Sequence, residues 1–207
     1  MMTVTRTYPR WPFFGVLAMV AAIVAGSLAA FDEPHAVLQH ITRYTARVAF
    51  LTFIIVFASG ALAALFPSPA TRWLRRNRRY TGLSFALAHF LHLIAIIVLF
   101  ATIGETPGLV TLLGGGLAYV FIAAMAATSN DWSVRKLGPR NWRRLHLAGL
   151  YYVWAIFMNS YLGRLASDAP PEPKWIFALT AALGFTSLAL RIAAWMKKRR
   201  KPALSTA

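Results

Sequence analysis

Three histidines lie inside long apolar stretches of this chain, and they are the side chains best suited to do chemistry there: His89, His92 and His146. Ionisable side chains are costly in lipid, so each is a candidate functional residue. Two imidazoles that face each other across a helix bundle suit the axial positions of a six-coordinate haem iron. Polar packing between helices explains the same histidines equally well, and the residues alone leave both interpretations open.

Composition excludes most other metal and redox sites. The chain has no cysteine, which excludes disulfides, thiolate-bound metals and iron–sulfur clusters. Two imidazoles do not make a zinc site, because zinc takes three or four ligands from protein. Arg143 and Arg144 precede His146, and at the headgroup level they are placed to meet haem propionates. Arg191 lies near the basic C-terminal tail, so we expect it to extend to the headgroups and assign it no role.

The elements that carry these residues must be membrane helices. Hydrophobic residues make up 58% of the 207 residues, charged residues 14%, and the mean hydropathy is +0.55. A soluble enzyme is excluded, and the short loops leave no room for a flavin or nicotinamide domain. Continuous apolar runs of about 20 residues predict helices rather than the alternating strands of a barrel. The predicted fold is an all-α integral membrane protein, a bundle of six transmembrane helices with spans Trp11–Phe31, Val48–Phe66, Tyr80–Ile103, Leu109–Thr128, Leu145–Leu162 and Trp175–Met196.

Charge sorting predicts the orientation of these spans. The net charge is +16, and the basic residues gather before span one, after spans two and four, and in the tail. Five of the six acids lie in the other connections, so the positive-inside rule predicts both termini in the cytoplasm (N-in/C-in). Topology and lipid thus explain the basic balance, and we predict no nucleic-acid partner. The predicted segments are a cytoplasmic N-terminus (1–10), a six-helix transmembrane haem-binding domain (11–196) and a basic cytoplasmic tail (197–207).

The sequence around the histidines resembles the ferric reductase-like transmembrane family. RRYTGL at 78–83 leads to His89, and the basic loop with RKLG at 135–138 leads to WRRLH at 142–146. The resemblance covers roughly residues 45–161 and is strongest to the compact bacterial branch, the haem-binding subunits of periplasmic methionine sulfoxide reductases. It implies haem b, with iron bound by His89 and His146. His92, one turn beyond His89, is an alternative ligand or a hydrogen-bond partner.

The resemblance also allows a prediction of how many haems the chain binds. Family members with a second, outer haem carry another histidine about four turns further along each of these two helices. The corresponding residues here are about Ile103 and Asn159, neither of which is a haem ligand. His35 and His40 are expected to be solvated residues of an outer loop. We therefore predict one haem, in the inner leaflet.

The predicted function is an electron-transfer subunit in the bacterial inner membrane. Electrons would pass from a cytoplasmic-side donor, a flavin such as FMN or a quinol, to a periplasmic acceptor, which the resemblance suggests is a methionine sulfoxide reductase. The redox partner would be that reductase or a cytoplasmic flavin reductase. Two alternatives stay open: a ferric or superoxide-forming oxidoreductase, and a degenerate non-redox member that acts as an assembly or binding partner. A transporter has little support, because the spans lack acidic residues.

Overall fold

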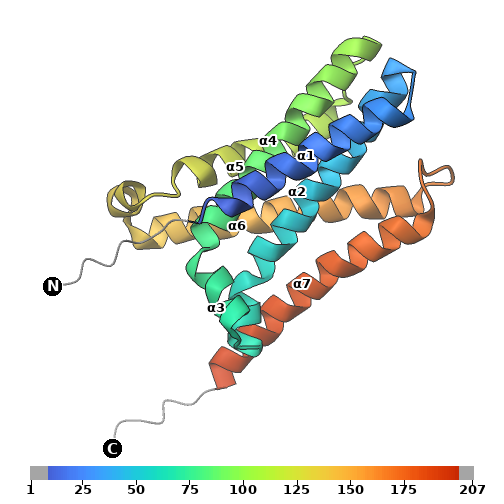
Figure 1. The fold of residues 1–207 in the computed structure, drawn as a ribbon. Helices are drawn as coiled ribbons and strands as arrows, with labels where there is room; N and C mark the ends of the chain where they lie inside the picture. The colour runs from blue at the N-terminus through green and yellow to red at the C-terminus, as the bar shows by residue number, and fades with distance from the viewer. Residues whose placement is uncertain (1–8, 201–207) are drawn as a thin grey trace, which may run out of the picture. The chain divides into compact units, whose positions relative to one another are not determined.

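A computed structural model describes residues 9–200, and that range contains seven helices and no strand (Figure 1). Most of the predicted N-terminal segment and most of the predicted tail lie outside the described residues. The helices are α1 (Trp11–Ala30), α2 (Pro34–Leu65), α3 (Pro69–Arg76), α4 (Arg78–Ile103), α5 (Leu109–Ala127), α6 (Asp131–Ala166) and α7 (Lys174–Arg200).

The all-helical class is confirmed, and several helices suit a membrane. α1, α2, α4 and α7 are each long and apolar enough to cross one. Residues 111–127 of α5 and the whole of α6 form a pair bent by 117°, which adds a fifth candidate span if the pair is counted as one. All six predicted windows fall on helices, whereas length and composition support four or five spans.

Helix α2 begins much earlier than predicted. Its first residue is Pro34, a favoured residue for the first helical turn because its missing N–H has no partner there in any case. The helix then runs through polar residues before it reaches the predicted start at Val48. His35 and His40 therefore lie on a helix, and the prediction that they are loop residues is wrong.

Helix α6 consists of two helices joined at a break. Asn130 caps the first part, because its side chain accepts a hydrogen bond from the backbone N–H of Ser133 at 2.7 Å. Gly138 then adopts φ 76° and ψ 148°, a left-handed backbone that favours glycine. Pro139 follows at the start of the second part, which contains the predicted span Leu145–Leu162.

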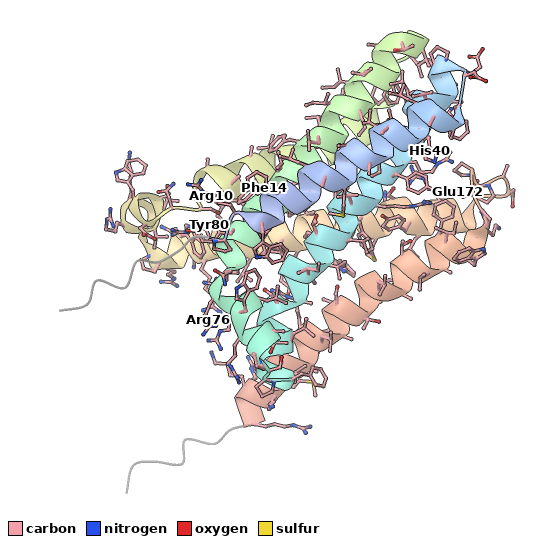
Figure 2. The ribbon with its side chains drawn as sticks, in the orientation of Figure 1. Arg10, Phe14, His40, Arg76, Tyr80 and Glu172 are labelled. Carbon is pink, nitrogen blue, oxygen red and sulfur yellow. The ribbon has the colours of Figure 1, made fainter. Side chains whose placement is uncertain are left out.

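The chain divides into two compact units. The first holds α1, the part of α2 up to Phe53, and α4. Within it α1 packs along α4, and Arg10 and Tyr80 mark the same end of that pair (Figures 1 and 2). Phe53 is fully buried, and its ring centroid lies 5.3 Å from that of Phe85. This aromatic core holds the histidine-bearing face of α4 in place.

The second unit holds the rest of α2 together with α3, α5, α6 and α7. Helix α6 packs against both α5 and α7 (Figure 1). One phenol and one indole of α6 donate hydrogen bonds to carbonyls of the neighbouring helices. Tyr152 Oη donates to Gly114 O and Trp154 Nε1 donates to Gly184 O, each at 3.0 Å. These cross-helix bonds fix the rotation of α6, and with it the direction of His146.

Candidate functional site

Helix α4 carries His89 and His92 one turn apart in the first unit. His89 is buried, with 8% of its surface exposed. Its ring centroid lies 5.5 Å from Phe85 and 5.9 Å from His92, and the two imidazoles meet edge to face. Because both side chains leave one side of one helix, an iron in this unit has two adjacent candidate ligands.

Thr45 of α2 fixes the tautomer of His92. The Thr45 hydroxyl is buried and donates its proton within its own helix, to Ile41 O at 2.8 Å with Thr42 O at 3.1 Å. Its oxygen lies 3.1 Å from His92 Nδ1, and with the hydroxyl proton directed at Ile41 O the ring donates there. The lone pair of His92 is then on Nε2, as in histidines that bind metal and donate their other N–H to a neighbour. Sequence reasoning missed Thr45, whose only signal is a hydroxyl residue in an apolar helix.

His146 belongs to the second unit, and a threonine orients it too. Thr128 donates its proton to Ala124 O at 2.7 Å, and its oxygen lies 3.1 Å from His146 Nε2. With the hydroxyl proton directed at Ala124 O, the ring donates from Nε2 and carries its lone pair on Nδ1. Trp142 stacks on the ring at a centroid distance of 4.0 Å and bonds Thr128 O through Nε1 at 2.8 Å. Binding of iron through Nε2 requires the ring to leave Thr128.

His40 is held as firmly as His92. Ser27 of α1 is fully buried and donates to Ile23 O, and its oxygen lies 2.8 Å from His40 Nδ1. The half-buried ring packs against Tyr44 at 4.2 Å, in the part of the first unit away from Arg10 (Figure 2). By the same reasoning its lone pair is on Nε2. His35, in contrast, is exposed, and its Nε2 lies 2.8 Å from the side-chain nitrogen of Gln39.

The arginines near His146 lie on different sides of α6. Arg140, Arg143 and Arg144 line an open groove of about 440 Å³ with Pro139 and Leu147. At about 100° per residue, Arg143 is about 60° around the helix from His146, whereas Arg144 is about 160° away. Of the two predicted propionate contacts, Arg143 is therefore the better placed.

Arg191 does not extend away from the bundle, contrary to the sequence expectation. Its Nη1 donates to Phe57 O at 2.7 Å, and its Nε to Tyr151 Oη at 3.3 Å. The guanidinium lies over both aromatic rings, 4.3 Å from the centroid of Phe57 and 5.0 Å from that of Tyr151. It therefore ties α7 to α2 and α6 within the second unit.

The donor set fits a haem better than a metal ion held by side chains alone. Among residues 9–200, no group of three or more His, Asp or Glu side chains is placed to hold an ion. A porphyrin supplies four of the iron's ligands and asks for one or two imidazoles, which the oriented histidines provide. Arg143 adds a cation for a propionate.

Three curated relatives show what the chain is similar to. The protein of Bordetella pertussis is 28% identical over 171 residues, which cover 78% of each chain. That of Rhizobium meliloti is 26% identical over 162 residues, 76% of this chain and 73% of the relative. That of Yersinia pseudotuberculosis is 30% identical over 156 residues, 68% and 72% respectively. Each is named protein-methionine-sulfoxide reductase heme-binding subunit MsrQ. No family model and no solved structure matches the chain.

Proposed function

This chain belongs to the family of MsrQ heme-binding subunits, and we propose that it binds haem b in a bacterial inner membrane and carries electrons toward a periplasmic acceptor. The observation that carries the proposal is the orientation of His92. It donates its Nδ1–H to a threonine of a neighbouring helix and leaves Nε2 available, as iron-binding histidines commonly do with a nearby acceptor. When bound, haem b supplies a one-electron carrier within the membrane.

We propose the six-span, N-in/C-in topology for this function. In it α5 and the second part of α6 each cross the membrane, and the break at Gly138 lies at the cytoplasmic surface. The charge distribution supports it, because RKLGPRNWRR at 135–144 surrounds the break while Glu105 and Asp168 lie in the outer connections.

The proposed iron ligands are His146 and one histidine of α4. The family resemblance assigns His89 to that position. The hydrogen bond from His92 to Thr45 favours His92, because it leaves the lone pair on Nε2, the nitrogen further from the backbone. Thr45 acts as the positioning residue of His92, and Arg143 neutralises a propionate at the headgroup level.

The proposed electron path runs from the cytoplasmic side outward. A flavin, FMN on a reductase or at the membrane surface, or a membrane quinol supplies the electrons. The acceptor is a periplasmic methionine sulfoxide reductase, which the names of the relatives support. A ferric or superoxide-forming oxidoreductase uses the same ligand set with a different acceptor.

One observation favours a non-redox assembly or binding partner as the second candidate. His146 Nε2 already has an acceptor in Thr128, so the side chain is satisfied as a packing histidine. In that case His146 links α5 to α6 and binds no iron.

The visible spectrum of the purified full chain, expressed with ample haem, separates these functions. We expect a low-spin haem b spectrum that His146→Ala abolishes. His92→Ala should abolish it too while His89→Ala retains it, if Thr45 marks the ligand. His35→Ala, which removes an exposed imidazole, is the control and should change nothing. A wild-type chain without haem would refute electron transfer and support the non-redox candidate.

A further inference from the structure

The break at Gly138 separates a short helix, the first part of α6, from the groove that Arg140, Arg143 and Arg144 line. The first part of α6 exposes 60% of Trp132 and 39% of Leu137. Lys136 Nζ lies 4.7 Å from the centroid of the Trp132 ring, so cation and aromatic group share one face. Exposed tryptophan beside lysine is typical of a helix that lies at a membrane–water interface. In the proposed topology the groove therefore opens at headgroup depth.

The groove carries a positive charge that no described residue neutralises. Its three arginines are exposed and project from two successive turns of α6. Within residues 9–200 none of their guanidinium groups takes part in a hydrogen bond or ion pair. Asp131, on the far side of the break, is the one acid between residues 107 and 166. An anion from outside the chain is the natural counter-charge.

We propose that this groove binds the phosphate of an anionic phospholipid. Guanidinium groups match phosphate oxygens with two parallel hydrogen bonds, which favours phosphate over a simple halide. Pro139 and Leu147 form the apolar part of the lining, against which the glycerol backbone and upper acyl chain can pack. Arg140 and Arg144 face away from His146, so we assign the lipid phosphate to these two arginines of the groove and leave Arg143 to the proposed propionate contact. Lipid binding by Arg140 and Arg144 therefore does not depend on the haem.

The size of the effect follows from the charges. A basic residue near an anionic surface strengthens binding by about fivefold. Loss of Arg140 should therefore weaken lipid binding about fivefold, and loss of Arg140 and Arg144 together about 25-fold. The groove should discriminate phosphatidylglycerol from phosphatidylcholine, because the choline cation opposes the arginines.

The test is native mass spectrometry of the full chain in neutral detergent, titrated with phosphatidylglycerol, phosphatidylcholine of the same acyl chains, or inorganic phosphate. We expect one tightly bound phosphatidylglycerol, about fivefold weaker binding in Arg140→Gln and no tight phosphatidylcholine. Arg72→Gln, which removes an exposed arginine of α3, is the charge-matched control and should bind as the wild type does.

Three results would overturn the proposal. Equal binding of the two lipids would mean that acyl chains and not phosphate determine affinity. An equal loss in Arg72→Gln would mean that overall charge, not the groove, attracts the lipid. Inorganic phosphate bound as tightly as the lipid would identify a site for free anions instead. Unchanged visible absorption and thermal unfolding of Arg140→Gln establish that the variant is folded.

Discussion

Replacement of Thr45 by valine tests whether the hydrogen bond to His92 orients an iron ligand. Valine keeps the shape of threonine but removes the oxygen that lies 3.1 Å from His92 Nδ1. A buried N–H left without its acceptor costs about 1–3 kcal/mol. At 1.4 kcal/mol per tenfold change, that cost corresponds to a loss in haem affinity of roughly 5- to 140-fold. The range agrees with the 10–100-fold losses typical when the hydrogen-bond partner of a metal-bound histidine is removed.

The assay is transfer of haem from the purified protein to an excess of an apo-haem-binding protein, followed by visible absorption. Thr42→Val is the matched control. It removes a hydroxyl one turn away on the same helix. That hydroxyl donates a hydrogen bond to Ala95 O at 3.3 Å and not to a histidine. We expect Thr45→Val to lose haem faster than the wild type and Thr42→Val to lose haem at the wild-type rate. Equal rates in the two variants would refute the reasoning, because helix packing rather than histidine orientation would then be the cause.

Three further predictions concern helix packing and topology. Arg191→Met should lower the free energy of unfolding by about 2 kcal/mol, because it removes a charge-assisted hydrogen bond and two ring contacts. Chemical unfolding in detergent measures this loss, and an unchanged free energy would mean that lipid or detergent replaces these contacts. Gly184→Val should destabilise the second unit, because a Cβ there collides with the sulfur and terminal methyl of Met158, whereas Gly163→Val meets open space and should keep the wild-type melting temperature. A reporter fused after Ala207 should be active in the cytoplasm, and a periplasmic signal would contradict the N-in/C-in topology.

Apolar length predicted most of the fold. The predicted spans beginning at Trp11 and Tyr80 match α1 and α4 to within two residues at each end. Lipid tolerates only long runs of apolar helix, so hydropathy reports these elements directly. It does not report where a helix continues outside the apolar run. That is why the start of α2 at Pro34 and the helical position of His40 were missed.

The candidate site was predicted in its residue types and not in its contacts. Histidines within apolar runs are visible in the sequence because they are costly there. The threonine and serine oxygens that orient them lie on other helices, and which hydroxyl faces which imidazole depends on helix rotation. Thr45 and Ser27 resemble any other small polar residue of a membrane helix. The direction of Arg191 was missed for the same reason, since its carbonyl acceptor belongs to Phe57, 134 residues away.

The pyridine haemochrome assay on the purified full chain tests haem binding itself, because it identifies the haem type and counts haem per polypeptide. We predict haem b at a ratio near one. A ratio near two would contradict the single site and make His40, with its lone pair on Nε2, the first candidate for a second ligand. A ratio near zero in protein made with ample haem would contradict the proposed function itself.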